Sequence, residues 1–182
     1  MYLQVSSLGR YRGSAGMIEI VKGDITTLEV DCIVNAANTR LHRGMGVCGA
    51  IFKAAGEGLQ EYLWENYDGC PTGEARISPG FECLAKHIIH TVAPIWMGGI
   101  QNEPHLLRSC YEQTLQLALH HQIQSIAFPA LGCGVYRYPI EEATKIAYNA
   151  AQKHAENHQT RIVFCCFSEI VYEAYQKLFA EK

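Results

Sequence analysis

The stretch that decides the fold runs from Cys32 to Ala55 and reads CIVNAANTRLHRGMGVCGAIFKAA. An apolar run ends in asparagines, a glycine-rich loop follows, and apolar residues at helical spacing come after it. Glycine allows a backbone to approach a ligand closely and to turn its N–H groups inward. The first turn of a helix adds donors without partners and a partial positive charge. The order of strand, glycine loop and helix therefore indicates a loop that binds an anion.

The same order returns between Ile126 and Pro139, where the sequence reads IAFPALGCGVYRYP. A single loop of this kind is as often a tight connection between a strand and a helix, and the Gly44–Gly49 loop lacks the lysine and hydroxyl of a P-loop. Two such loops in one small domain predict a ligand with two adjacent phosphates, gripped from both sides.

The composition favours recognition of this anion by the main chain. The chain has 182 residues, of which 48% are apolar and 18% charged, and these values fit one globular domain. Its net charge is −3, so it has no excess of lysine and arginine to neutralise a nucleic-acid backbone. Backbone N–H groups must then supply much of the binding, and general nucleic-acid binding is not expected.

Cysteine usage predicts a cytoplasmic protein. The eight cysteines form no C-x-x-C pair, no secretory signal precedes the first predicted strand, and no apolar run approaches the roughly 20 residues of a membrane span. We therefore expect reduced cysteines. The first sixteen residues lack periodicity, so we assign residues 1–16 to a leader, a linker or an expression remnant, and residues 17–182 to a single domain.

Short apolar runs alternate with helical patterns along the rest of the chain. The predicted strands are Ile18–Val21, Cys32–Asn35, Ala75–Ser78, His87–Val92, Gln124–Phe128 and Ile162–Phe167. The predicted helices are Val47–Ala55, Gly58–Glu65, Glu103–His121, Ile140–His158 and Ile170–Ala180. This alternation predicts an α/β fold, a three-layer α/β/α sandwich with a central mostly parallel, mixed six-stranded sheet. Ligands of such folds bind beyond the carboxyl ends of the strands, so both glycine loops should open onto one cleft.

Several polar residues near these strand ends have two interpretations. Asp24 can accept a hydrogen bond from the amino group of a base, or it can cap a short helical turn, which the local sequence favours. Asn35 and Asn38 can hold ribose hydroxyls or a water, or they are turn residues, and the glycine loop that follows favours a functional role. Tyr136 packs either on a sugar or in the core.

The histidines and cysteines give no sign of a metal site or a nucleophile. His87 and His90 are three residues apart in a strand, so they point to opposite faces and are not expected to share a metal. Cys48 and Cys133 lie in the glycine loops, but a nucleophilic cysteine needs an activating neighbour, which the sequence does not place near Cys48. We expect these two cysteines to pack as small apolar side chains, and we expect no metal or cofactor.

Together these segments resemble a macrodomain, the ADP-ribose-binding α/β/α module, over nearly all of the chain from Ile18 to Leu178. The matching segments are Gly23–Thr26, Asp31–Asn38, Gly46–Ile51, Ala54–Gly56, Cys70–Ala75, Ile89–Pro94, Pro129–Tyr136 and Phe164–Ser168. So many motifs in one order make the resemblance specific. Within the family the chain is closest to the MacroD-type ADP-ribosyl hydrolases and O-acetyl-ADP-ribose deacetylases.

The resemblance implies a role for each candidate residue. Asp24 would bind the adenine amino group beside the Ile25 amide, and Phe167 would line the adenine pocket. Asn38 would hold the distal ribose, and Tyr136 would pack against it. The segments Gly46–Val47 and Gly132–Tyr136, the latter with Cys133, Gly134 and Val135, would wrap the diphosphate. Ile51 is a further expected ligand-binding position.

One position departs from the MacroD pattern. Those enzymes carry an aspartate, assigned to orienting or activating a water, where this chain has Cys48, ten residues after Asn38. Macrodomains of the alphavirus type also have Gly-Val-Cys there, and that branch includes hydrolases. The catalytic candidates are therefore Asn38 and the position of Cys48.

The resemblance implies a hydrolase that cleaves ADP-ribose from mono-ADP-ribosylated acidic side chains or from O-acetyl-ADP-ribose. A water held by Asn38 and a ligand phosphate oxygen would attack near the distal ribose, while the loop amides hold the diphosphate and stabilise developing charge. Two alternatives stay open. One is a non-catalytic reader of ADP-ribose, which Cys48 favours, and the other is an ADP-ribose-1''-phosphate phosphatase. No membrane partner is expected.

Overall fold

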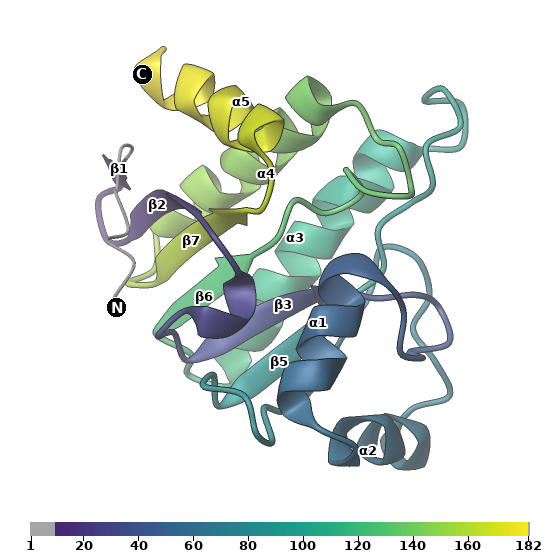
Figure 1. Cartoon of the computed structure of the whole chain (residues 1–182). Coiled ribbons are helices and arrows are strands. Elements are labelled where there is room, and N and C mark those ends of the chain that lie inside the picture. The colour runs from purple at the N-terminus through teal and green to yellow at the C-terminus, as the bar shows by residue number, and fades with distance from the viewer. Residues whose placement is uncertain (1–9, 182) are drawn as a thin grey trace.

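The computed structural model describes residues 10–181, and within them seven strands form one sheet. The strands are β1 (Arg10–Arg12), β2 (Met17–Lys22), β3 (Cys32–Ala36), β4 (Ala75–Pro79), β5 (His87–Thr91), β6 (Ser125–Phe128) and β7 (Arg161–Cys166). The helices are η1 (Ile25–Thr27), α1 (Gly46–Ala55), α2 (Gly58–Asn66), α3 (Glu103–His120), α4 (Ile140–Ala155) and α5 (Glu169–Ala180). The helices flank the sheet, as Figure 1 shows.

The strand order is β1-β2-β7-β6-β3-β5-β4. The five central strands are parallel, and β1 and β4 are antiparallel at the two edges. All six predicted strands are present, so the α/β/α architecture with a mixed, mostly parallel sheet is confirmed.

The seventh strand, β1, comes from the segment that the sequence assigns to a leader. Residues 1–9 of that segment lie outside the described residues. Residues 10–12 pair with β2, and the buried carboxylate of Glu19 joins three strands because it contacts Arg10 Nε at 3.4 Å and Arg161 Nη2 at 2.9 Å. The N–H of Gly16 also donates to the carbonyl of Ala155 at 2.7 Å. This part of the predicted leader therefore packs on the domain.

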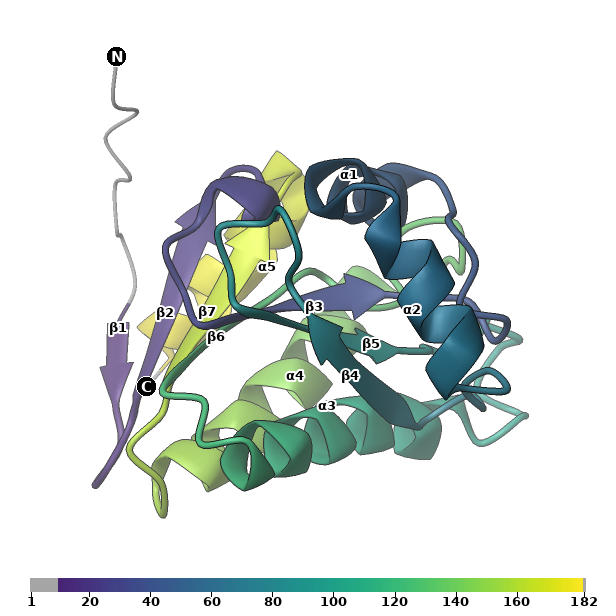
Figure 2. The same ribbon diagram turned by 90° about the horizontal axis from the view of Figure 1, so that it is seen from below.

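Two apolar layers fix the helices to the two faces of the sheet. Successive strand side chains point to opposite faces, so Val34 of β3 packs towards α3, α4 and α5, whereas Ile33 packs towards α1 and α2. Figure 2 shows α1 and α2 on one side of the sheet and α3 and α4 on the other. His87 and His90 follow the same rule: His87 lies beside His121 at the end of α3, and His90 lies beside Phe52 of α1. The prediction that they face opposite ways is confirmed.

The register decides where the predicted site residues lie. Lys22 of β2 is level with Cys166 of β7, and Phe128 of β6 is level with Phe164 of β7. Strand β3 lies beside β6 in the same direction. The carboxyl ends of β2, β7, β6 and β3 therefore follow one another along one edge of the sheet, and the segments that carry the candidate residues leave from that edge.

Candidate functional site

The first pair of candidates lies where β2 and β7 end. The N–H of Gly23 donates to the carbonyl of Cys166 at 3.0 Å, so the two strand ends are held together. Asp24 and Phe167 follow directly on the two strands. The sequence separates these residues by most of the chain, and the parallel pairing of β2 with β7 brings them to one place.

Asp24 caps the short helix η1, as the local sequence favours. Its Oδ1 atom accepts hydrogen bonds from Thr26 N at 2.9 Å and from Thr26 Oγ1 at 2.7 Å. The side chain is exposed, and its Oδ2 atom makes no hydrogen bond to residues 10–181. The N–H of Ile25 likewise donates to no acceptor in this part of the chain, although the Ile25 side chain is buried. One carboxylate oxygen and one amide are thus open to a ligand beside the cap.

Phe167 is 88% exposed at the carboxyl end of β7. A large aromatic ring in water forgoes the favourable burial that such a side chain usually obtains. The next residue, Ser168, has a local task because its hydroxyl caps α5 and accepts from Val171 N at 3.4 Å. Phe167 has no such task, and its ring is free to stack on a planar ligand.

The first glycine loop ends at the N-terminus of α1. Met45 is the N-cap residue and makes no capping hydrogen bond with its side chain. The N–H groups of Gly46, Val47 and Cys48 find no acceptor within the described chain. Donors of this kind, together with the helix dipole, form an anion site.

Asn38 is held by its own loop. Its Oδ1 accepts from His42 N at 3.1 Å, and its Nδ2 donates to His42 O at 2.8 Å. Gln60 of α2 holds the residues on either side of His42, because its Nε2 donates to Leu41 O at 3.1 Å and its Oε1 accepts from Arg43 N at 2.8 Å. Two amide side chains therefore fix residues 41–43. Gln60 was not among the predicted residues, since a polar residue on a helix face gives no signal of its own.

Cys48 lies beside Asn38 but is buried. A Cβ built on Gly44 would be 3.4 Å from Cys48 Sγ and 3.8 Å from Asn38 Nδ2, so the three residues meet. Burial raises the pKa of the Cys48 thiol, and hydrogen bonds from Asn35 and Gly44 only reduce that effect. The thiol is therefore neutral at pH 7 and supplies neither a nucleophile nor a base.

A buried polar chain runs behind Cys48. Asn35 Nδ2 lies 3.6 Å from Cys48 Sγ and 3.1 Å from His90 Nδ1, and His90 Nε2 lies 2.9 Å from Ser78 Oγ. Burial lowers the pKa of His90 to about 3, so the ring is neutral. The sequence analysis saw Asn35 and His90 separately and missed the chain, because only the pairing of β3 with β5 brings Asn35 level with His90, and the pairing of β5 with β4 brings Ser78 near it.

The second glycine loop presents another row of donors. The N–H groups of Gly134, Val135 and Tyr136 meet no acceptor in residues 10–181. The loop turns at Gly132, which has φ +78° and whose carbonyl accepts from Tyr138 N at 2.9 Å. A residue with a side chain rarely adopts this conformation. Val135 is 86% exposed, so it does not pack in the core.

Residues outside the second glycine loop hold Tyr136 and the neighbouring segment in place. Trp96 N donates to Tyr136 O at 2.8 Å, and the Tyr136 side chain packs in part against the core. Glu103, buried at the start of α3, accepts from the N–H groups of Met97, Gly99 and Gln101 at 2.7, 3.1 and 2.6 Å. The sequence analysis missed Trp96 because it acts through a contact with a distant segment. It missed Glu103 because an acidic residue at the start of a helix gives no sign that it is buried and accepts from the preceding turn.

Two other predicted residues lie off the open edge. Ile51 is completely buried in the layer between α1 and the sheet, so its role is packing. Cys133 is half-buried, and burial raises the pKa of its thiol to about 12. Among residues 10–181 there is no group of three or more His, Cys, Asp or Glu side chains arranged to hold a metal. The helices in this range include none with the length and hydropathy needed to cross a membrane.

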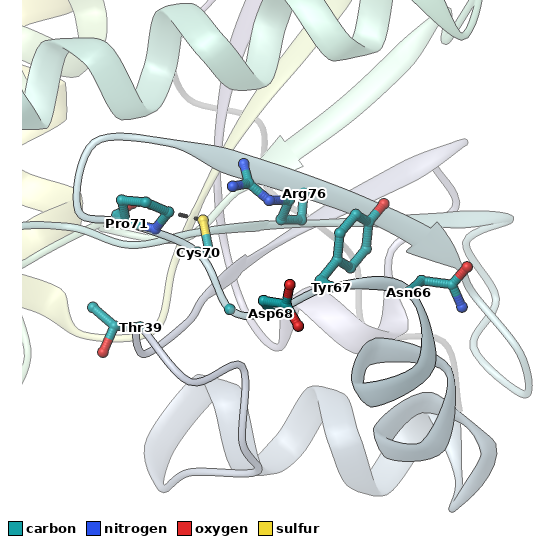
Figure 3. Close-up of a pocket in the computed structure, with 8 residues that line it drawn as sticks. Thr39, Asn66, Tyr67, Asp68, Cys70, Pro71 and Arg76 are labelled. Atoms are coloured by element: carbon teal, nitrogen blue, oxygen red, sulfur yellow. Dashed lines mark hydrogen bonds between the residues drawn. The ribbon is translucent and has the colours of Figure 1, made fainter.

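Two hollows lie near the sheet ends, away from the glycine loops. One, of about 610 Å³, is shown in Figure 3 and is lined by Thr39, Asn66, Tyr67, Asp68, Gly69, Cys70, Pro71 and Arg76. The other, of about 360 Å³, is lined by Glu29, Val30, Asp31, Leu84 and Ser125 and lies at the amino end of β3. The first touches the residue that follows Asn38.

Known proteins with the same sequence pattern and fold are macrodomains. A family model described as Macro domain matches residues 34–147. A Macro domain-containing protein of Chlorobaculum tepidum is 46% identical over 166 residues, which cover 90% of this chain and 96% of the relative. One from Xanthomonas axonopodis pv. citri is 47% identical over 170 residues, with 90% and 95% covered.

Solved structures agree with this assignment. The structure of the Oceanobacillus iheyensis macrodomain with ADP superposes with a TM-score of 0.90 at 38% identity and covers 94% of both chains. The Trypanosoma brucei macrodomain in complex with ADP gives a TM-score of 0.83 at 40% identity, over 88% of this chain and 67% of that one. The chain belongs to the Macro domain family.

Proposed function

We propose that this protein binds ADP-ribose along the carboxyl edge of its sheet and hydrolyses ADP-ribosyl esters there. The observation that carries the proposal is the pair of donor rows, Gly46–Cys48 and Gly134–Tyr136, that follow the adjacent strands β3 and β6. ADP-ribose has an adenine, a diphosphate and a distal ribose in line. Asp24 and Phe167 suit the adenine, the donor rows suit the diphosphate, and Asn38 suits the distal ribose.

Solved relatives support the binding half of this proposal. Structures of the Oceanobacillus iheyensis macrodomain include one with ADP and a variant with ADPR, at 38% identity to this chain. Their ligands contain the adenine and diphosphate for which the two halves of the edge are suited. Binding by main-chain N–H groups also fits a protein of net charge −3.

The chemistry that we propose needs a positioned water. Hydrolysis of an ADP-ribosyl ester consumes one water and yields ADP-ribose and a carboxylic acid. The Asn38 amide retains one acceptor site and one N–H after its two bonds to His42, which is enough to orient that water. Because the Cys48 thiol is neutral, a phosphate oxygen of the ligand is the proposed proton acceptor. The expected substrates are mono-ADP-ribosylated acidic side chains and O-acetyl-ADP-ribose.

One observation favours a second candidate, a reader that binds ADP-ribose without cleaving it. Cys48 is buried and uncharged beside Asn38, so no ionised side chain assists the water at this position. A reader needs the donor rows and the adenine site but not the water.

Measurements of turnover and of binding on the same protein distinguish the hydrolase from the reader. Wild-type protein should release ADP-ribose from a mono-ADP-ribosylated glutamate peptide, and Asn38→Ala should lower kcat by about 100-fold, as loss of a positioning group does, with ADP-ribose affinity within about threefold in calorimetry. Asn157→Ala, an exposed asparagine at the end of α4, is the matched control. Tight binding without any release by the wild type would establish the reader instead.

We also propose a cytoplasmic location. All eight cysteines of the chain are free, as expected in a reducing compartment.

A further inference from the structure

The hollow of about 610 Å³ in Figure 3 lies where the row of proposed ligand positions ends. That row follows β2, β7, β6 and β3 in order, and the next strands of the sheet are β5 and the edge strand β4. If ADP-ribose lies along the row with its distal ribose at Asn38, whatever is joined to that ribose continues towards β4. This inference rests on the proposed function.

The hollow is joined directly to the loop that holds Asn38. Its wall includes Thr39, the next residue, and the N–H of Cys70 donates to the carbonyl of Thr39 at 2.9 Å. Gly69 allows this approach, because a Cβ at that position would come within 2.6 Å of the Thr39 carbonyl oxygen. The segment 66–71 and the Asn38 loop therefore share a fixed contact, and the hollow begins at the residue next to Asn38.

A single cation, Arg76 of β4, lines the hollow. Its Nη2 contacts Glu74 Oε2 at 2.9 Å, its Nη1 donates to Ala75 O at 3.0 Å, and its guanidinium lies over the Tyr67 ring at 5.9 Å. Tyr67 is itself fixed because its hydroxyl donates to Ile77 O at 2.7 Å. A guanidinium has five N–H groups, so the arginine is held in place while most of its donors stay available.

The wall of the hollow also supplies backbone donors. The N–H groups of Asp68 and Gly69 meet no acceptor in the described chain. Two carboxylates lie against the positive charge of the arginine: that of Glu74, which is ion-paired with Arg76, and that of Asp68, which lines the hollow. Fixed guanidinium and amide donors of this kind suit a carboxylate.

We propose that this hollow is an acceptor subsite, which binds a carboxylate-bearing polypeptide segment next to the ADP-ribosylated side chain. The protein would then prefer ADP-ribosylated proteins with acidic residues around the modified position over O-acetyl-ADP-ribose, which has nothing to place in the hollow.

The test compares two substrates on the same variants. For Arg76→Gln, kcat/KM for a mono-ADP-ribosylated peptide with flanking aspartates should fall about tenfold, the cost of one charge-assisted hydrogen bond, while kcat/KM for O-acetyl-ADP-ribose stays unchanged. Asp68→Asn, which removes the carboxylate that lines the hollow, should raise the peptide value. Arg108→Gln, an exposed arginine on α3, is the matched control and should alter neither.

The outcomes separate the subsite from the proposed function. Equal losses on both substrates with Arg76→Gln, or no loss on either, would overturn the subsite and leave the hydrolase standing. If the wild type binds but does not cleave, the same comparison is made in calorimetry between the ADP-ribosylated peptide and ADP-ribose, and a peptide with no affinity advantage overturns the subsite. A wild type that does not bind ADP-ribose overturns the proposed function itself.

Discussion

At the scale of single residues, Asp24 illustrates how one side chain can cap a helix and still offer an oxygen to the proposed ligand. One carboxylate oxygen caps η1, and the other has no hydrogen-bond partner among the described residues. The two sequence interpretations of Asp24 therefore do not compete, because they use different oxygen atoms.

Asp24→Asn separates these purposes. Asparagine caps helices as well as aspartate does, so the melting temperature should stay the same. Its amide N–H₂ would then face the adenine amino group, donor against donor, and ADP-ribose affinity should fall at least tenfold, or by about 1.5 kcal/mol. Calorimetry measures the ADP-ribose affinity, and thermal unfolding measures the melting temperature. Unchanged affinity would leave Asp24 with the cap alone.

Gln60 shows the opposite case, a residue with no local signal that controls a proposed catalytic one. Gln60→Ala removes the two bonds to Leu41 and Arg43 and should lower kcat about tenfold while ADP-ribose affinity changes little, because the donor rows are intact. Glu61→Ala on the exposed side of α2 is the control.

A double-mutant cycle checks that Gln60 acts through Asn38. In the Asn38→Ala background, Gln60→Ala should have no further effect on kcat. Additive losses would mean that Gln60 acts by another route.

At the scale of elements, the sequence was informative wherever a local pattern decides the structure. Apolar runs predict β2 to β7 because these strands are buried by the sheet and its helices, fully in the centre and in part at the edge strand β4. The glycine loops are visible because few other residues fit such turns. Strand β1 gives no such pattern: it has two arginines in three residues, and its pairing with β2 is what makes it a strand.

The turn of the second loop can be tested at Gly132. Alanine there must adopt φ +78°, and its Cβ would be 3.2 Å from Tyr138 Cβ. We expect Gly132→Ala to lower the free energy of unfolding by about 1–2 kcal/mol and to weaken ADP-ribose binding. Gly134→Ala, where a Cβ meets no atom within 4 Å, should leave the free energy of unfolding unchanged. Denaturant unfolding compares the two, and equal losses would contradict this account of the turn.

At the scale of the whole molecule, strand order was beyond the sequence. Alternation predicts parallel strands, but nothing local says that β3 lies between β6 and β5. The contact of Asn35 with His90 depends on that order, because β3 and β5 become neighbours only when the chain folds.

The buried histidines predict how stability depends on pH. Burial lowers the pKa of His90 to about 3, and burial with the nearby His158 lowers that of His154 to about 4, from an ordinary value of 6.5. Below pH 6.5 these histidines are protonated in the unfolded chain, whereas in the folded protein their rings stay neutral. Stability should therefore be full above pH 6.5 and fall by about 1.4 kcal/mol per pH unit for each histidine, down to about pH 4 for His154 and about pH 3 for His90.

The variant His90→Asn removes one of these two buried titratable side chains. It should unfold more easily at every pH, because Ser78 and Asn35 lose their partner, but its stability should fall less steeply between pH 6.5 and 3. His105→Asn, at an exposed position on α3, is the control and should keep the wild-type slope. An unchanged slope in His90→Asn would contradict the assignment.

The pairing of β2 with β7 has a consequence for how the protein is made. Strand β2 is synthesised before the neighbour that completes its pairing, β7, which is the last strand of the sheet in chain order. Until then only the three residues of β1 flank it, and an open strand edge is prone to pair with other chains. A nascent chain halted before Arg161 should therefore tend to aggregate, and it should lack the proposed binding of ADP-ribose, since the edge is complete only once β7 has been made.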